Sequence, residues 1–251
     1  MRDTRPAIVV TGIGGVCPLG VGVARFWPRM VKGESAIGPF DLFPNQRHRT
    51  HMAAITPTAG PLDQRAQCSR TDHFAVAAAR EALNMAGLEQ DPRERTGLVF
   101  GSSTGGLLEA ERFFEGLHRG ERRQSTRILA AQQNSAPAEA VARVLELSGP
   151  VQTLSTACVS ASMALELARS MLEDGECDVI LAGGSDGLCQ LTYAGFNSLR
   201  AVDARPSRPF RKDRAGLSLG EGAAVLVLET EDHARARGAV VLAEFGSCQQ
   251  E

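Results

Sequence analysis

The chain has 251 residues, a formal net charge of −2, 43% hydrophobic residues and 22% charged residues. This balance argues against a general role on nucleic acid or on an anionic membrane surface, because both attract strongly basic chains. No apolar run approaches the roughly 20 residues of a membrane span, and the N-terminus carries no secretory apolar core. We therefore expect a soluble, cytoplasmic protein with enough apolar residues for a core.

The first part of the chain predicts a strand followed by two helices. Residues 7–11 form a β-branched run that is expected to end in a glycine turn over 12–15. These glycines resemble the start of a dinucleotide fingerprint, but Cys17 stands where the third glycine is required, so we expect no nucleotide site. Three further segments are predicted here: a helix over 21–31, an irregular surface segment over 33–70, and a helix running from its cap Asp72 to Gly87.

The second part of the chain alternates strands and helices in the same way. A strand over 96–100 leads into residues 101–106, whose serines have no recognisable acid and histidine partners, so a backbone turn is expected there. A strand over 178–182 is expected to end at Gly183 and Gly184. The remaining expected elements are helices over 107–117, 136–147 and 231–237, strands over 223–228 and 239–245, and a basic loop over 197–216.

The most informative stretch is 151–162, which changes from strand to helix. Apolar and polar residues alternate up to Ser155, and helical spacing begins near Ala161. Cys158 lies at this junction, near the positive end of the helix dipole and beside free backbone N–H groups. Both features favour the thiolate, the reactive form of cysteine. We therefore predict that Cys158 is a nucleophile.

The other five cysteines show no comparable placement. All six are scattered without a Cys-x-x-Cys pair: Cys17, Cys68, Cys158, Cys177, Cys189 and Cys248. A reducing cytosol disfavours disulfides, and the spacing does not match a zinc site. We expect the other cysteines to be small buried hydrophobic residues.

Strands alternating with helices predict an α/β class: one domain with a mostly parallel sheet covered by helices on both faces. Several stretches then resemble, in order, the N-terminal half of a β-ketoacyl-acyl carrier protein synthase, a condensing enzyme of fatty-acid and polyketide assembly. The resembling stretches are Val9–Gly14, Ser155–Cys158, Ala182–Asp186, Gly195-Phe196, Ser207–Phe210, Asp213–Gly216 and Leu219–Ala224. The resemblance implies a thiolase-like fold built from two αβαβα halves.

The same resemblance implies an acyltransferase reaction without metal or nucleotide cofactor. Cys158 would accept an acyl group from acyl carrier protein, and a malonyl thioester would lose carbon dioxide and attack that acyl group. Backbone N–H groups, one of them that of Cys158, would form the oxyanion hole. Phe196 would line the acyl pocket, and Arg122, Arg123 and Arg205 would contact the acidic carrier protein.

The resemblance also implies a homodimer, or a heterodimer with a synthase-like subunit, formed through the strand near 151–155. Two catalytic histidines of the family are expected in a second half. We therefore expect residues 1–238 to be the N-terminal synthase domain and 239–251 to begin a missing C-terminal half or to meet a complementing chain. The five histidines lie outside the family's histidine contexts: His48, His51, His73, His118 and His233.

Two alternatives remain open at this stage. A non-catalytic chain-length-factor-like partner subunit would share the fold, although such partners usually lack the cysteine. A thiolase that acts on coenzyme A thioesters would share both the fold and the cysteine. Acyl length, and the choice between a fatty-acid and a polyketide or polyene pathway, also stay open.

Overall fold

A mixed sheet of seven strands forms the centre of the computed structural model, which describes residues 6–57, 68–88, 95–121 and 125–246. Its strands are β1 (Ile8–Cys17), β2 (Gly20–Val21), β5 (Thr96–Gly101), β6 (Val151–Leu154), β7 (Val179–Asp186), β9 (Gly222–Thr230) and β10 (Ala243–Glu244). The helices are α1 (Val23–Val31), α2 (Arg70–Met85), α3 (Leu107–His118), α4 (Ala136–Val144), α5 (Ser160–Glu173), α6 (Gln190–Ser198) and α7 (Glu231–Ala236), with short 3-10 helices η1 (Thr126–Gln132) and η2 (Ala157–Val159).

The order of the main sheet is β10-β1-β9-β7-β5-β6, and β2 pairs with β1. The β5 strand is parallel to both β6 and β7, whereas β9 is antiparallel to both β1 and β7. The predicted α/β class is confirmed, but the sheet is mixed rather than mostly parallel. The reason is β9, which returns between two strands that run in the opposite direction to it.

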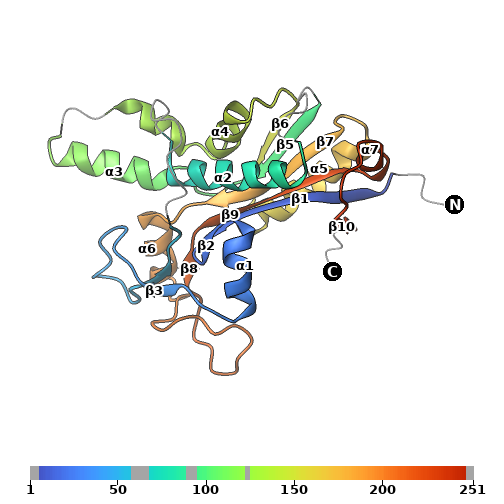
Figure 1. The fold of residues 1–251 in the computed structure, drawn as a ribbon. Helices are drawn as coiled ribbons and strands as arrows, with labels where there is room; N and C mark the ends of the chain where they lie inside the picture. The colour runs from blue at the N-terminus through green and yellow to red at the C-terminus, as the bar shows by residue number, and fades with distance from the viewer. Residues whose placement is uncertain (1–5, 58–67, 89–94, 122–124, 247–251) are drawn as a thin grey trace.

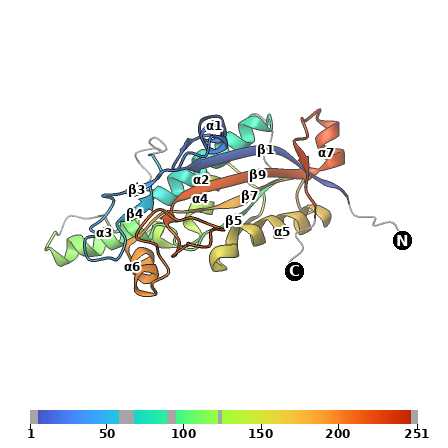
Figure 2. The same ribbon diagram turned by 90° about the horizontal axis from the view of Figure 1, so that it is seen from below.

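Helices cover the two faces of this sheet, as Figure 1 shows, and each face has its own apolar core. On one face α2 and α4 pack over the strands, with Phe74 and Leu83 fully buried. On the other face α5 packs against β5 and β7 through Ala164 and Ala168 (Figure 2). This three-layer arrangement is typical of α/β proteins.

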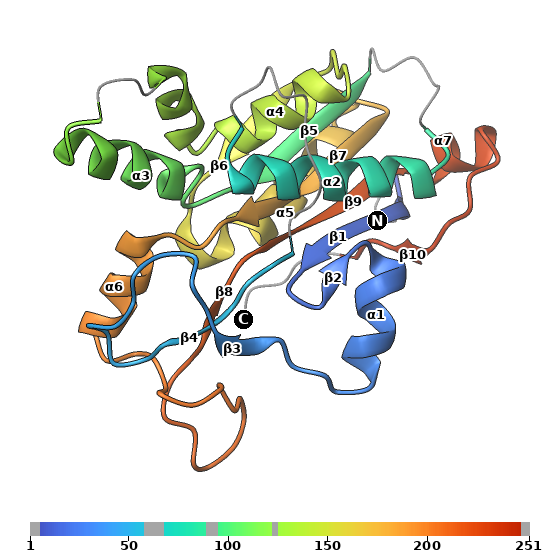
Figure 3. The same cartoon turned by 60° about the vertical axis from the view of Figure 1, so that its left-hand side comes forward.

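A second, small sheet lies beyond one end of the main sheet, close to α6 (Figure 3). It consists of β3 (Ile37–Pro39), β4 (Met52–Ala54) and β8 (Leu219–Gly220). The segment over 33–70 was expected to be irregular, and in its described part these short strands are added to irregular backbone. Tyr193 of α6 anchors this region, because its hydroxyl donates to the Thr50 carbonyl at 2.9 Å.

The turn predicted over 12–15 is wrong, because these glycines lie inside β1. The strand continues through the glycines to Cys17. Their missing side chains leave room for α2 to lie directly on the strand. A Cβ atom at Gly12 would lie 2.1 Å from the Ala82 carbonyl oxygen, and one at Gly14 would lie 1.9 Å from that of Ala78. Likewise, β7 continues through its glycines to Asp186 instead of ending at them.

Carboxylate side chains bind N–H groups at the starts of three helices, and two of these carboxylates are distant in sequence from the helix. Ser69, not Asp72, is the N-cap of α2, and Asp72 is the third residue of a capping box that accepts from the Ser69 N–H at 2.7 Å. The α1 helix has no cap of its own, and Glu81 accepts from the Val23 N–H at 2.7 Å. Glu111 accepts from two N–H groups at the start of α6 in the same way.

The strand expected over 239–245 is shorter than predicted. Only Ala243 and Glu244 pair as β10, opposite Val10 and Val9, and the flanking Leu242 and Phe245 N–H groups donate to the Val10 and Ile8 carbonyls at 2.8 and 2.7 Å. Among the described residues there is no helix long and apolar enough to cross a membrane. The described part of the chain also contains no group of three or more His, Cys, Asp and Glu side chains arranged to hold a metal ion.

Candidate active site

The ends of three neighbouring parallel strands place Cys158 at one edge of the sheet. The β5, β6 and β7 strands run in the same direction, and Cys158 lies in η2 between β6 and α5. Its side chain is exposed and borders a hollow of about 270 Å³. The lining residues are Gly101, Ala157, Cys158, Ser160, Ala161, Gly184, Ser185, Asp186, Gly222, Ala223 and Ala224. Sites at the carboxyl ends of parallel strands are common in α/β folds.

Small residues allow the start of α5 to approach the sheet at this hollow. A Cβ atom at Gly101 would lie 2.6 Å from the Ala161 backbone nitrogen, and one at Gly184 would lie 3.1 Å from the Ala161 Cβ. The start of α5 is therefore pressed against β5 and β7. As a result, Cys158 is held on a rigid turn at the sheet edge.

The residue before the cysteine has an unusual backbone conformation. Ala157 has a φ of 53°, in the left-handed region that residues other than glycine rarely adopt. Its carbonyl oxygen accepts from the Ser160 hydroxyl at 2.7 Å and from the Ser103 hydroxyl at 3.1 Å. The Ser160 hydroxyl also accepts from the Thr156 N–H at 2.9 Å. These bonds hold the strained turn in place.

Asp186, at the end of β7, holds the neighbouring turn. One of its carboxylate oxygens accepts from the Ser103 N–H at 2.9 Å, the Thr104 N–H at 2.8 Å and the Thr104 hydroxyl at 2.8 Å. The same oxygen accepts from the Ser102 hydroxyl at 3.1 Å. The expected backbone turn after β5 is thus confirmed, but sequence reasoning gave no role to Asp186. The available signal was an acidic residue at the end of one predicted strand and a serine-rich turn at the end of another, and the pairing of β5 with β7 brings them together.

The serines of this turn are not arranged as a hydrolase triad. Residues 101–105 do match the letters Gly-x-Ser-x-Gly, yet the Ser103 hydroxyl donates to a carbonyl oxygen and contacts the Ser160 hydroxyl at 3.3 Å. Histidine is absent from the residues lining the hollow. His233 instead contacts the Glu229 carboxylate at 2.7 Å, and the His48 ring lies against Tyr193.

The other predicted site residues lie away from Cys158 or outside the described residues. Phe196 is half-buried on α6 and does not line the hollow, so its assignment to an acyl pocket stays a prediction. Arg122 and Arg123 fall outside the described residues. Arg205 is exposed in the loop between α6 and β8.

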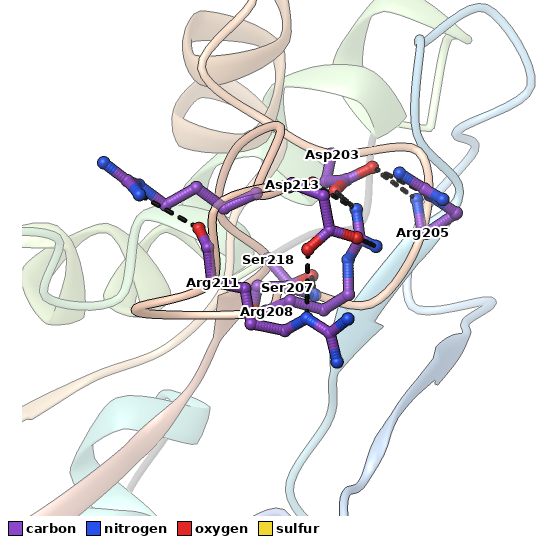
Figure 4. Close-up of polar contacts among 8 residues, drawn as sticks. Asp203, Arg205, Ser207, Arg208, Arg211, Asp213 and Ser218 are labelled. Carbon is purple, nitrogen blue, oxygen red and sulfur yellow. Dashed lines mark hydrogen bonds and ion pairs between the residues drawn. The ribbon is translucent and has the colours of Figure 1, made fainter.

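That loop carries a cluster of arginine and aspartate side chains that bind one another (Figure 4). Arg208 donates to the Asp213 carboxylate at 2.5 Å and lies 3.5 Å from that of Asp203. Arg211 donates to Asp213 at 3.0 Å, and the Arg205 N–H donates to Asp203 at 3.0 Å. These arginine contacts keep the pKa values of Asp203 and Asp213 below their usual range.

Two of the other cysteines differ from Cys158 in their surroundings. Cys177 and Cys189 are buried, and burial raises the pKa of both thiols. Cys17 and Cys68 are half-buried, and Cys248 lies outside the described residues. Cys158 is the exposed thiol of the described residues.

Fold and site together define an α/β protein with an accessible cysteine at a strand–helix junction, a class that includes thiol-dependent acyltransferases. Residues 5–234 match the family described as "Beta-ketoacyl synthase, N-terminal domain". The chain therefore belongs to the β-ketoacyl synthase family, as its sequence motifs predicted. The likeness to solved ketosynthases, with TM-scores of 0.85 and 0.86, confirms the expected thiolase-like α/β fold.

Individual relatives agree with this assignment. The chain is 39% identical, over 95% of its length, to the "Putative polyketide beta-ketoacyl synthase 1" of Streptomyces halstedii, and covers 61% of that protein. It superposes on "The ishigamide ketosynthase/chain length factor" with a TM-score of 0.86 at 30% identity, covering 96% of this chain and 62% of that one. A ketosynthase solved in complex with a type II polyketide acyl-carrier protein gives a TM-score of 0.80 at 27% identity, covering 96% of this chain and 62% of that one.

Proposed function

We propose that Cys158 accepts an acyl group from the thioester of an acyl carrier protein and that the assembled synthase condenses this group with a malonyl thioester. The exposure of the thiol at the end of the parallel strands, beside a hollow, is the observation that carries this proposal. The hollow gives a thioester carbonyl room to reach the sulfur. Family membership supports a condensing enzyme over a hydrolase.

The loading step needs only a thiolate and donors for an oxyanion. The Cys158 sulfur attacks the thioester carbonyl, a tetrahedral intermediate forms, and the carrier leaves as its thiolate. The Cys158 N–H makes no hydrogen bond within the described part of the chain, so it is available to the developing oxyanion. The sulfur is left carrying the acyl group as a new thioester.

Condensation then consumes a malonyl thioester. Loss of carbon dioxide leaves a carbanion, which attacks the acyl carbonyl and releases the Cys158 thiolate together with a β-ketoacyl thioester. The resemblance assigns stabilisation of the decarboxylation to two histidines of a second half. We propose that residues 1–238 form the N-terminal domain, that 239–251 lead into that half, and that this chain without such a complement loads acyl groups but does not condense them.

A carrier protein and a second synthase-like subunit are the proposed partners. Arg205 is exposed in the basic loop, and Arg122 and Arg123 are assigned to the same contact by resemblance. β6 is one of the two edge strands of the main sheet, with half-buried to exposed residues, and its free edge is able to pair across a two-fold axis. We propose a cytoplasmic homodimer or heterodimer of this kind, acting in polyketide or fatty-acid synthesis.

Replacement of the thiol tests the proposal. Cys158→Ala should abolish transfer of an acyl group from an acyl-carrier-protein thioester to the protein, measured as the mass increase of the intact protein. Cys68→Ala is the matched control, because this half-buried thiol lies outside the hollow, and it should load like the unaltered protein. Undiminished loading of Cys158→Ala would place the nucleophile elsewhere.

A further inference from the structure

Three donors converge on one carbonyl oxygen beside the nucleophile, and the acyl-transfer steps described above do not use them directly. The Ala157 oxygen accepts from the Ser160 N–H, from the Ser160 hydroxyl at 2.7 Å and from the Ser103 hydroxyl at 3.1 Å. The two Ser160 donors come from the same turn of chain, whereas Ser103 comes from the end of β5, 54 residues earlier. Of these three donors, Ser103 is therefore the one that ties the Ala157 carbonyl to the sheet.

The orientation of this carbonyl fixes the neighbouring N–H group. The Ala157 carbonyl and the Cys158 N–H belong to the same peptide unit, which is planar and trans, so the two groups point in opposite directions. Holding the oxygen on the serine side aims the N–H away from the serines. The φ of 53° at Ala157 means that this peptide would relax if its contacts were lost.

Asp186 fixes Ser103 in turn. Its carboxylate oxygen accepts from the Ser103 N–H at 2.9 Å and from both the N–H and the hydroxyl of Thr104 at 2.8 Å. Asp186 ends β7, which pairs in parallel with β5, so the contact joins two adjacent strands of the sheet. The path therefore runs from the sheet through Asp186 and Ser103 to the Ala157 carbonyl.

We propose that Ser103, held by Asp186, is a positioning residue that aims the Cys158 N–H at the oxyanion of the acyl-transfer intermediate. This inference rests on the proposed function of Cys158 as acyl acceptor. Ser103 exchanges no proton and touches no substrate; its hydroxyl donates to the Ala157 oxygen throughout. Its effect is confined to the step in which negative charge develops on the thioester oxygen.

Two reactions of the same thiol separate positioning from general structural damage. Transfer from the N-acetylcysteamine thioester of hexanoic acid passes through an oxyanion, whereas alkylation by iodoacetamide does not. Ser103→Ala should slow acyl transfer by about tenfold, because the two Ser160 donors remain and the N–H is misaimed rather than removed. The rate of alkylation at Cys158, and its pH profile, should stay within about twofold of the unaltered protein.

Matched variants sharpen the test. Ser198→Ala removes a similar hydroxyl-to-carbonyl bond on α6, remote from the hollow, and should change neither rate. Ser103→Thr keeps the hydroxyl and should restore acyl transfer. Asp186→Asn keeps an acceptor oxygen and should act mildly, whereas Asp186→Ala should slow acyl transfer like Ser103→Ala.

The outcomes are distinguishable. Unchanged acyl transfer in Ser103→Ala would overturn the positioning role, and so would an equal loss of acyl transfer and alkylation, which would mean that the variant only disrupts the site. If the unaltered protein alkylates at Cys158 but never takes up the acyl group, the proposed function fails instead. Slowed acyl transfer with unchanged alkylation supports the inference.

Discussion

The hollow beside Cys158 and the basic loop between α6 and β8 are both polar regions, but they are held in different ways. At the hollow, buried side chains bind backbone groups, as where the Ser185 hydroxyl donates to the Thr71 carbonyl at 2.9 Å. In the loop, the contacts are ion pairs: Arg211 and Asp213 are 66% and 54% exposed, and only the inner Asp203 is buried, at 4%. The first region is fixed by packing, and the second by charges that water and salt screen.

This difference matches the roles proposed for the two regions. A nucleophile and its oxyanion donor need a geometry held to a fraction of an ångström, which packed backbone provides. A surface that meets a carrier protein needs an accessible charge more than a fixed one. Substitutions near the hollow should therefore have large effects that persist in salt, and those in the loop small effects that salt removes.

The largest expected effect is a loss of stability from a single added methyl group. Gly101→Ala places a Cβ 2.6 Å from the Ala161 backbone nitrogen, which cannot move without shifting α5. We expect a loss of about 3 kcal/mol in the free energy of unfolding, measured by urea denaturation. Gly195→Ala, in α6 with no atom within 4 Å of the added group, should instead be neutral or stabilise by about 0.5–1 kcal/mol. Equal effects of the two variants would contradict the packing argument.

A second prediction concerns a carboxylate at the start of α2, next to the packed end of the sheet. Burial raises the pKa of Asp72 to about 6 from a normal value of 3.8. The folded state therefore favours the protonated form, and its stability falls as pH rises from about 4 to about 6, by up to about 3 kcal/mol. The free energy of unfolding should be measured against pH for the unaltered protein and for Asp72→Asn. Below pH 4 the difference between the two should stay constant, and between pH 4 and pH 6 the variant should become more stable relative to the unaltered protein.

Asp213 in the loop should show the opposite sign. The Arg211 hydrogen bond is the largest cause of its lowered pKa, so its contribution is present above about pH 4 and is lost as pH falls further. Relative to Asp213→Asn, the unaltered protein should lose stability only on acidification, by a small amount that salt reduces. If both aspartates gave the same sign, the contrast between the two regions would be wrong.

The smallest expected effect is on the encounter with the carrier protein. Arg205→Ala should slow loading from an acyl-carrier-protein thioester by about two- to fivefold at low salt and leave loading from a small thioester unchanged. The difference should vanish at high salt. Arg235→Ala, which removes a similarly exposed arginine from α7, is the control. Equal rates for the two variants at low salt would remove Arg205 from the proposed contact.

Much of the fold was predictable because it depends on local patterns. The alternation of strands and helices, the end of α1, the bounds of α3 to within one residue, and the placement of Cys158 between β6 and α5 all follow from short-range spacing. The glycines of β1 were misinterpreted as a turn because their meaning lies in α2, whose backbone occupies the space of the missing Cβ atoms. Likewise, the mixed pairing follows from where β9 inserts, which no local pattern contains.

Of the candidate site, only the position of Cys158 was predictable. Cys158 is marked by a change of periodicity within one short stretch. The roles of Ser103 and Asp186 require knowing that β5 and β7 are neighbours, a fact of topology between residues 83 positions apart. Ser69 was missed as the cap of α2 because Asp72, which completes the capping box, is an equally good cap by type.

The central claim is that Cys158 carries the acyl group, and peptide mapping after loading tests it most directly. The protein is treated with an acyl-carrier-protein thioester, digested, and each cysteine peptide is examined by mass spectrometry for the acyl mass. We predict that the peptide containing Cys158 carries it and that the peptides containing the other five cysteines do not. Acylation of another cysteine with Cys158 left unmodified would contradict the account.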